Sequence, residues 1–326
     1  MMRSLYAGVS GIRAHQIKMD VIGNNISNVN TQGFKAGRAC FVDLFNQTMR
    51  GATSPSSGLG GMNAMQVGLG VSTATVDRAF TTGATMTTGR MLDLALQGDG
   101  LFVCKRGSDL FYTRSGNLYL DEDGFLLTAS GQYLQGIMID SEYSQREVTY
   151  EIEGVSHTVT ETTIGLEVPE PITRYVFESD KEDIEWGDLS DPENEERFEL
   201  IGDIVFPLDF TNFSIDRTGL VTGLSPGGEL VDIAVLPLAA FANYEGLTLE
   251  GDNLYTQSSN SGVPLFKQAG QGGAVGDMRA GALEMSNVDL SKEFTDMIVT
   301  QRGFQANSRI ITVSDTMLEE LINLKR

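Results

Sequence analysis

The chain has 326 residues, of which 41% are hydrophobic and 21% charged, a composition typical of a folded protein with two or three domains. Its net charge of −21 argues against binding to nucleic acid, which requires a basic face. No apolar run approaches about 18 residues, so we expect no membrane insertion. The first residues lack an apolar block followed by a small-residue cleavage site, so no cleaved signal peptide is expected.

The N-terminal segment is predicted to form a helix with a narrow apolar stripe. Apolar residues recur there at a spacing of seven, and others widen the stripe: Leu5, Ile12, Met19 and Ile26, then Val9, Ile22 and Val29. Ser4 is the expected N-cap. Gly8, Gly11 and Gly23 each cost about 1 kcal/mol relative to alanine inside a helix. The helix should therefore depend on a packing partner for its order.

The end of this helix is predicted from residues of low helix propensity. They are Asn24, Asn25, Asn28, Asn30 and Thr31. Gly33 then offers the left-handed conformation with which many helices end. We expect 1–35 to belong to a terminal helical domain.

The middle of the chain has the pattern of an antiparallel β domain. Residues 51–70 are rich in Gly, Ser, Met and Asn, which predicts an extended loop within a linker over 36–70. Short apolar runs follow, at Leu101–Cys104, Phe111–Thr113, Asn117–Leu120, Phe213–Leu220 and Asp232–Ala242. Glycine-containing turns separate them at intervals of about ten residues, as in sheets and barrels. We expect a β-rich domain over 71–140 and 212–262, and a second linker over 263–282.

A smaller domain is predicted as an insertion over 141–211. Between Glu178 and Glu199, eleven acidic residues are opposed only by Lys181 and Arg197. Such a run is typical of a solvated surface. A cation site is the alternative, although no ligand spacing there is diagnostic.

The C-terminal segment predicts a long helix in a domain over 283–326. Five apolar residues keep a spacing of seven without a proline: Leu290, Met297, Phe304, Ile311 and Leu318. A second row is apolar only at its ends: Phe294, Gln301, Ser308, Asp315 and Ile322. Ser286, with Asp289 three residues later, is the expected start, and Lys325 and Arg326 suit the end. Roughly 37 helical residues would span about 55 Å and require a partner along that length.

Two arrangements of the terminal helices are open. They either lie on one globular core, or pair with each other or with copies from neighbouring subunits. A seven-residue seam is narrower than the stripe that a surface helix buries, which favours pairing. The expected fold class is α+β, with N- and C-terminal helices paired as a coiled coil. A discontinuous, mainly antiparallel β domain would carry the inserted, smaller β-rich domain.

No catalytic, cofactor or metal motif stands out in the sequence. The two histidines, His15 and His157, exclude most histidine-rich metal centres, and His15 is expected on a polar helix face. Asp121–Gly124 resembles part of a calcium loop, but that loop would lack carboxylates at its first and last positions, so a hairpin turn is expected. Cys40 and Cys104 could form a lone disulfide, but are expected to be buried thiols. We predict assembly rather than catalysis, with no cofactor and no metal. An enzyme is the rival class and would need a polar pocket in the insertion.

Several motifs occur in a fixed order along the chain. At the N-terminus they are Leu5–Ile12, Met19–Thr31 and Gly33–Lys35, and at the C-terminus Ser286–Leu290, Gln301–Asn307 and Asn323–Lys325. Between them lie Thr88–Gly89, Leu92–Ala95, Gly98, Gly100–Phe102, Asn253–Tyr255 and Asn260–Gly262. In this order they resemble the bacterial flagellar rod and hook proteins, the axial family of the flagellum. The resemblance covers everything except the acidic insertion.

The resemblance implies a helical polymer. The terminal helices would pair into a coiled coil lining a central export channel, with β domains arranged outward. The expected partners are copies of the chain itself, neighbouring rod, hook-cap and hook–filament junction proteins, and the flagellar type III export apparatus. The expected location is the hook or basal body of the flagellum, outside the cytoplasm. A head-to-tail interface that does not close into a ring produces such a filament.

Within the family, the resemblance favours the hook, the flexible joint that passes torque from rod to filament. Gly89–Arg90 before Leu92–Asp93, and Ile215–Gly223, look hook-like, and rod proteins usually lack an insertion of this size. The alternative is the distal rod of the basal body, because an added segment over Gly51–Gly70 is similar to the distal rod pattern.

The apolar rows and the resemblance together mark an expected assembly interface on both terminal segments. Its residues are Leu5, Val9, Ile12, Met19, Ile22, Asn24, Asn25, Ile26, Asn28, Asn30, Thr31, Gly33, Phe34, Leu290, Phe294, Met297, Gln301, Arg302, Phe304, Gln305, Asn307, Ile311, Leu318 and Ile322.

Overall fold

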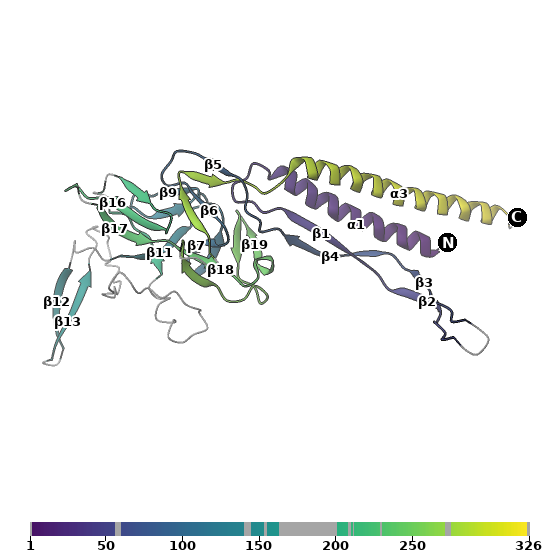
Figure 1. Cartoon of the computed structure of the whole chain (residues 1–326), viewed down its shortest axis with the longest axis horizontal. Coiled ribbons are helices and arrows are strands. Elements are labelled where there is room, and N and C mark those ends of the chain that lie inside the picture. Colours follow the sequence, from purple (N-terminus) through teal and green to yellow (C-terminus); the bar gives the residue numbers. More distant parts are fainter. Residues whose placement is uncertain are drawn as a thin grey trace. The chain divides into compact units, whose positions relative to one another are not determined.

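The structure is a computed structural model of the chain (Figure 1). It describes residues 2–55, 60–139, 145–152, 155–162, 201–207, 210, 212–228, 230–270 and 275–324. The chain divides into two compact units. The helical unit comprises Met1–Asn30, Lys35–Phe80 and Asn287–Arg326, and the β unit comprises Thr31–Phe34 and Thr81–Ser286.

The C-terminal helix α3 is Leu290–Asn323, as long as the heptad pattern predicts to within a turn. The predicted start at Ser286 is wrong. The carboxylate of Asp289 accepts hydrogen bonds from the backbone N–H groups of Ser291 and Lys292, so Asp289 is the N-cap. A carboxylate at this position satisfies free N–H groups and also opposes the positive end of the helix dipole.

The N-terminal helix α1 is Met2–Ser27. The predicted cap Ser4 is wrong, because Ser4 lies inside the first turn. The helix ends among its asparagines as predicted, and the Asn28 side-chain amide donates to the backbone oxygen of Asn24 at 3.0 Å. Such side-chain bonds satisfy carbonyls that the last turn leaves free. Gly33 has the expected left-handed conformation, with a φ of 67°, but it belongs to the β unit and does not cap α1.

Two antiparallel ribbons complete the helical unit. Strand β1 (Gly37–Asp43) pairs with β4 (Val71–Arg78), and β2 (Asn46–Arg50) pairs with β3 (Met65–Gly68). The predicted linker over 36–70 is therefore wrong, since three strands lie in it. Every residue of β2 and β3 is exposed, so these strands lack the alternation by which a half-buried strand is recognised.

An antiparallel sheet organises the β unit, and over the described residues it has 13 strands. Its main path is β15-β16-β17-β11-β7-β8-β20-β19, with the other strands pairing alongside. The strands are β7 Leu101–Arg106, β8 Asp109–Thr113, β9 Leu118–Leu120, β10 Leu126–Thr128, β11 Tyr133–Met138, β14 Gly202–Asp203, β15 Phe213–Ile215, β16 Leu220–Leu224, β17 Leu230–Val235, β18 Pro237–Ala240, β19 Thr248–Gly251, β20 Leu254–Thr256 and β21 Leu265–Gln268. The mainly antiparallel β domain is thus confirmed.

Further strand pairs and a 3-10 helix lie outside this sheet. They are β5 Thr85–Thr87 paired with β23 Ala282–Glu284, β6 Leu94–Gln97 paired with β22 Asp277–Ala280, β12 Gln145–Ile152 paired with β13 Val155–Thr162, and the 3-10 helix η1 Tyr244–Gly246. The predicted linker over 263–282 is wrong, because β21 and β22 lie within it and Phe266 and Met278 are buried. Both strands pair with segments far away in sequence, which local pattern does not reveal.

The core of the β unit lies between the inward faces of these strands. It is formed by Leu94, Leu96, Phe102, Leu118, Leu126, Leu134, Ile204, Phe206, Ile215, Val221, Ile233, Ala234, Leu236, Leu238, Ala240, Ala269, Val275 and Met278. The predicted strands at Leu101–Cys104 and Asp232–Ala242 contribute to it.

The hairpin turn predicted at Asp121–Gly124 is confirmed. It joins β9 to β10, and the Gly124 N–H donates to the Asp121 carbonyl at 3.0 Å. Gly124 has a φ of 82°, and a Cβ there would lie 2.3 Å from the Phe206 carbonyl oxygen, so only glycine fits.

The predicted inserted domain over 141–211 lies mostly outside the described residues, together with the acidic run Glu178–Glu199. Strand β14 lies within its predicted bounds, and so do Ile204 and Phe206, which belong to the core of the β unit. Strand β14 pairs with β11, with Gly202 opposite Gly136, so the chain returns to the strand from which it departed.

Candidate assembly interface

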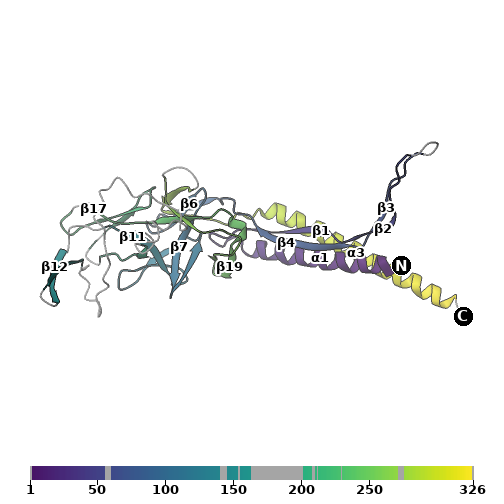
Figure 2. The ribbon, with the colours of Figure 1, turned by 90° about the horizontal axis from the view of Figure 1, so that it is seen from below.

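Helices α1 and α3 of the helical unit run antiparallel and pack against each other (Figures 1 and 2). Their contacts follow in order along the pair: Gly8 with Ile311, Gly11 with Asn307, His15 with Gly303, Lys18 with Asp296, and Asn25 with Glu293. The N- and C-terminal helices therefore pack against each other within one subunit.

Four of the five residues of the first predicted row are half-buried, whereas the fifth, Leu290, is 39% exposed. Met297, Phe304, Ile311 and Leu318 are half-buried. The predicted second row does not face α1, because Phe294 is 50% and Ile322 69% exposed, and Gln301 and Asp315 are exposed. The second row that is shielded from solvent is instead polar and consists of the half-buried Glu293 and Asn307 and the buried Thr300 and Ser314. This polar row starts three residues after Leu290, whereas the predicted apolar row starts four residues after it. A pattern of apolar residues does not reveal a polar row.

Small residues allow the two helices to approach closely. A methyl group on Gly11 would lie 2.5 Å from the side-chain nitrogen of Asn307, and one on Gly8 would lie 3.3 Å from Ile311 Cγ1. Gly23 has no atom within 4 Å of such a methyl group. The cost in helix propensity at Gly8 and Gly11 is therefore offset by close packing of the two helices. At Gly23 no contact within the subunit requires a glycine.

Asn25 joins three elements of the helical unit and is 2% exposed. Its Nδ2 donates to the Gly37 carbonyl on β1 at 2.9 Å and to Glu293 Oε1 on α3 at 3.2 Å, while its Oδ1 accepts from the Gly37 N–H at 2.9 Å. Burial raises the pKa of Glu293, against the hydrogen bond from Asn25, which lowers it. The sequence predicted Asn25 as an interface residue, but it did not indicate that Gly37 and Glu293 are its hydrogen-bond partners.

The sequence predicted His15 on a polar helix face, and this prediction is wrong. Its ring lies against Gly303 and makes an edge contact with Phe41 of β1, with centroids 6.2 Å apart. Its Nδ1 is buried and has no hydrogen-bond partner among the described residues. Burial, helped by the nearby Lys18, lowers the pKa of His15.

Large apolar side chains remain exposed on the helical unit. On α3 and its C-cap they are Leu290, Phe294, Ile298, Val299, Ile310, Val313, Met317, Leu321, Ile322 and Leu324, and on α1 they are Tyr6, Val9 and Ile17. The ribbons add Phe41, Val42, Leu44, Phe45, Met49, Met62, Met65, Val67, Leu69 and Val76. Phe45 is 86% exposed. So large an apolar surface is typical of proteins that bind a partner there.

The remaining predicted interface residues divide by position. Leu5, Ile12, Met19, Ile22, Ile26, Asn28 and Asn307 are buried or half-buried within the helical unit, and Asn24, Asn30, Arg302 and Gln305 are exposed there. Thr31, Gly33 and Phe34 belong to the β unit. There the Gly33 N–H donates to the Glu284 carbonyl at 2.9 Å, so these residues are part of a packed β structure.

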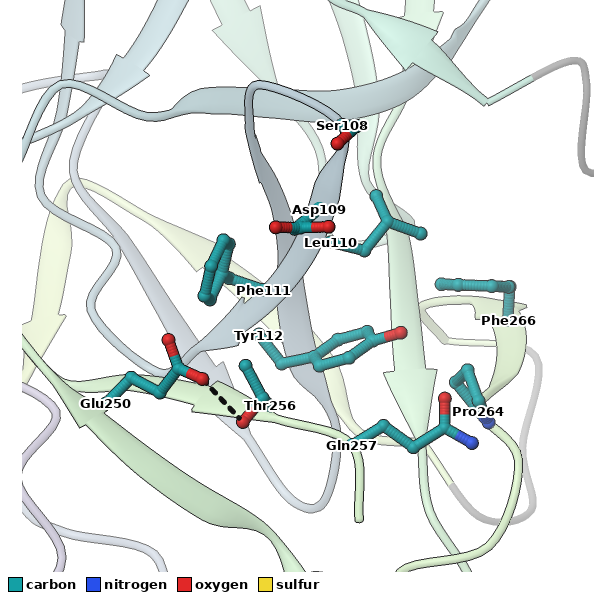
Figure 3. A pocket seen from close by; sticks show the side chains of 10 residues that line it. All are labelled: Ser108, Asp109, Leu110, Phe111, Tyr112, Glu250, Thr256, Gln257, Pro264 and Phe266. Atoms are coloured by element: carbon teal, nitrogen blue, oxygen red, sulfur yellow. Dashed lines mark hydrogen bonds between the residues drawn. The ribbon is translucent and has the colours of Figure 1, made fainter. Parts of the chain in front are cut away.

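A shallow hollow of about 500 Å³ lies in the β unit beside β8 and β20 (Figure 3). Asp109, Tyr112, Glu250 and Gln257 are among the residues that line it, and the Thr256 hydroxyl donates to Glu250 at 3.4 Å. An enzyme was expected to need a polar pocket within the insertion. This hollow lies outside the insertion. Over the described residues, no group of His, Cys, Asp and Glu is arranged to hold a metal ion, and no helix is long and apolar enough to span a membrane.

Both cysteines are free thiols. Cys104 is buried as predicted, and burial raises its pKa to about 12. Cys40 is only half-buried, with its Sγ 3.8 Å from Asp77 Oδ2, so the prediction of a buried thiol is wrong there.

Three family models match the chain. They are described as flagellar basal body rod protein, over residues 5–35, flagellar hook protein FlgE/F/G D1 domain, over 95–223, and flagellar basal body rod FlgEFG protein C-terminal, over 279–324. The flagellar basal-body rod protein FlgG of Bacillus subtilis is 40% identical, with 100% of both chains covered. The flagellar hook protein FlgE of Borreliella burgdorferi is 32% identical over 443 aligned positions, with 100% of both covered. FlgE of Salmonella typhimurium is 30% identical, with 99% of this chain and 100% of that protein covered.

Proposed function

Since this chain belongs to the family of bacterial flagellar rod and hook proteins, we propose that it is the subunit of a helical polymer and builds the flagellar hook. Members of the family are structural components that assemble with each other into the extracytoplasmic part of the flagellum. The hook would carry torque from the rod to the filament around a central export channel.

The observation that supports a polymer is the uncovered apolar surface of the helical unit. Burial of one large apolar side chain stabilises by about 1.5–3 kcal/mol, so a row of them is costly in water. An isolated two-stranded ribbon such as β2–β3 is also marginal without a partner. Copies of the same chain can cover these surfaces, and a head-to-tail contact between different surfaces extends without limit.

We propose that α1 and α3 form a coiled coil that lines the channel. The predicted interface residues that remain exposed, among them Val9, Leu290, Phe294, Gln301 and Ile322, would contact neighbouring copies. Half-buried residues of the apolar row, such as Phe304, would hold the pair together. The insertion over 141–211 would form an outer domain, because β11, which precedes it, pairs with β14, which lies near its C-terminal end.

The hook is favoured over the rod by the size of the insertion and by the full-length match to hook proteins of two other genera. The distal rod is the second candidate. It is favoured by the 40% identity to a rod protein and by the β2–β3 ribbon, which occupies the segment that resembles the distal rod pattern.

Imaging of filaments assembled from the purified chain tests the proposal. Polymerisation into a tube is expected, and a protein that stays monomeric at every concentration and salt would contradict it. Phe304→Asp should block assembly because it brings a charge into the helix contact. The matched control is Ser308→Asp, which adds the same charge on the same helix at a half-buried position of the predicted second row.

Two further measurements separate the hook from the rod. Hook filaments should be curved and compliant, and rod filaments straight. In cells that produce the chain with a surface tag, the hook lies outside the cell and would be labelled by antibody on intact cells. The rod would be labelled only after the envelope is opened. The partners proposed above, namely rod, hook-cap and junction proteins and the type III export apparatus, would be identified by crosslinking in those cells.

A further inference from the structure

The root of the β1–β4 ribbon is bound by side-chain amides rather than by another strand. Gly37 presents its N–H and C=O at the strand edge, and both are bonded to the Asn25 amide at 2.9 Å. One step outward, the Ala36 N–H donates to Asn287 Oδ1 at 2.8 Å, and Asn287 Nδ2 donates to the Ala79 carbonyl at 2.7 Å. Each amide thus takes the place of a peptide group of a neighbouring strand.

A side-chain amide is suited to make both bonds at once. It offers an acceptor and two donors in one plane, whereas a carboxylate only accepts and an ammonium only donates. Asn25 uses both of its donor hydrogens, one to the Gly37 carbonyl and one to Glu293. Because Asn25 is 2% exposed, water does not replace a lost partner easily.

The other end of the ribbon is attached to the same helix. The Val71 N–H donates to the Ser10 hydroxyl at 3.3 Å, and Ser10 donates to the Ala7 carbonyl at 2.9 Å. Val71 is the register partner of Asp43, the last residue of β1. From Ser10 to Asn25 the helix rises about 22 Å. The strand Gly37–Asp43 spans about 20 Å, so helix and ribbon match in length between the two attachments.

We propose that Asn25 and Asn287 are positioning residues that fix the β1–β4 ribbon against the helix pair and so place its exposed apolar face for contact with another copy. The second half of this statement rests on the proposed function. Strand and helix have different side-chain periods, so their apolar faces alone leave the register loosely specified. Polar attachments at the two ends remove that freedom.

Substitution of Asn25 by aspartate tests the claim. Asn25→Asp keeps the shape but turns a donor toward the Gly37 carbonyl into an acceptor, and it adds a charge beside Glu293. Amide exchange of Gly37–Asp43 and Val71–Arg78 in the full-length monomer should become about tenfold faster, the equivalent of one lost hydrogen bond. Exchange of the β unit should not change, which provides an internal reference. Gln16→Glu is the matched control, since it makes the same change from amide to carboxylate at an exposed position of the same helix that is not among the predicted interface residues.

A pH profile separates positioning by the amide from a general effect on stability. The charged groups around Asn25 are Glu293, Lys292 and Asp296 on α3, and Lys18 on α1. On the ribbon, Arg78 is opposite Gly37 and donates to the Lys35 carbonyl at 3.1 Å. In Asn25→Asp, protonation of the introduced aspartate on acidification supplies one O–H that can donate to the Gly37 carbonyl, so ribbon protection relative to the wild type at the same pH should recover in part at low pH. Asn25→Asp with Glu293→Gln should recover part of it at neutral pH, because the glutamine amide donates to the aspartate.

The expected result is faster ribbon exchange, recovery by acid and by Glu293→Gln, and weaker polymerisation of Asn25→Asp. Unchanged ribbon exchange, or an equal effect of Gln16→Glu, would overturn the positioning role. Normal polymerisation with a released ribbon would overturn the link to assembly. If Asn25→Asp unfolds the helix pair, Asn287→Asp tests the same claim at Ala36 and Ala79. Wild-type protein that does not polymerise would contradict the proposed function alone, because the exchange measurement needs only monomer.

Discussion

The Arg114 guanidinium donates to the Glu284 carboxylate at 3.2 Å in the β unit, and the two side chains are 1% and 0% exposed. The other oxygen of Glu284 accepts from the Gly83 N–H at 2.8 Å, and Arg114 also donates to the Gly98 carbonyl. The pair therefore connects segments that are remote in sequence. A buried ion pair of this kind contributes less to net stability than to the correct register of the segments it joins.

Removal of one charge of this pair should be severe. Glu284→Gln leaves the Arg114 charge buried without a counter-charge, and we expect a loss of about 3–5 kcal/mol in the free energy of unfolding of the β unit. Chemical denaturation of the full chain measures it. Asp277→Asn is the control, because it breaks the exposed pair with Arg217 in the same unit and should leave the midpoint nearly unchanged. Equal losses in the two variants would show that the buried pair contributes no more to the stability of the β unit than the exposed pair does.

Substitution by alanine should stabilise α1 more at Gly23 than at Gly11. In Gly23→Ala the new methyl group meets no neighbour, so the substitution should stabilise α1 by up to about 1 kcal/mol through the higher helix propensity of alanine. The helix content of the monomer should rise accordingly. Gly11→Ala gains the same propensity but pushes Asn307 away, so its gain should be smaller or reversed. Thermal unfolding followed by far-UV circular dichroism compares them. A larger gain at Gly11 would mean that the helices do not approach as closely in solution.

Acid should destabilise the helix pair through His15. Burial lowers its pKa below the ordinary value of 6.5, so the unfolded chain takes up a proton at a pH where the folded chain does not. Its contribution is complete above pH 6.5 and is lost as the pH falls through the folded pKa. NMR titration of the imidazole checks the direction. Unfolding of His15→Asn between about pH 7 and about pH 5 should show a weaker pH dependence than the wild type.

The two cysteines should differ in reactivity. Cys104 is buried, its thiol donates to the Phe111 carbonyl at 3.4 Å, and its pKa is raised to about 12, so little thiolate forms at neutral pH. Native protein should therefore be alkylated at Cys40 only, and Cys104 should react after denaturation. Mass spectrometry of the labelled peptides distinguishes the sites. In Cys40→Ser, rapid labelling of the native protein would contradict the burial of Cys104.

The sequence alone determined the parts of this protein that depend on local pattern. Heptad rows predicted both terminal helices, because a helix buries residues at fixed intervals and the row Leu290–Leu318 repeats that interval. Turn residues predicted the antiparallel sheet, since Gly124 and its equivalents adopt conformations that few other residues tolerate. The order of motifs indicated the family.

Tertiary structure decided what depends on polar or distant partners. The second row of the helix contact is polar, so no hydrophobic pattern marks Thr300 or Ser314. The ribbons are exposed, so their strands showed no alternation, and β21 and β22 pair with segments far away in the chain. The partners of Asn25, Asn287 and Glu284 became visible only when remote backbone groups met in the fold, because a hydrogen bond depends on position in space and not on spacing along the chain.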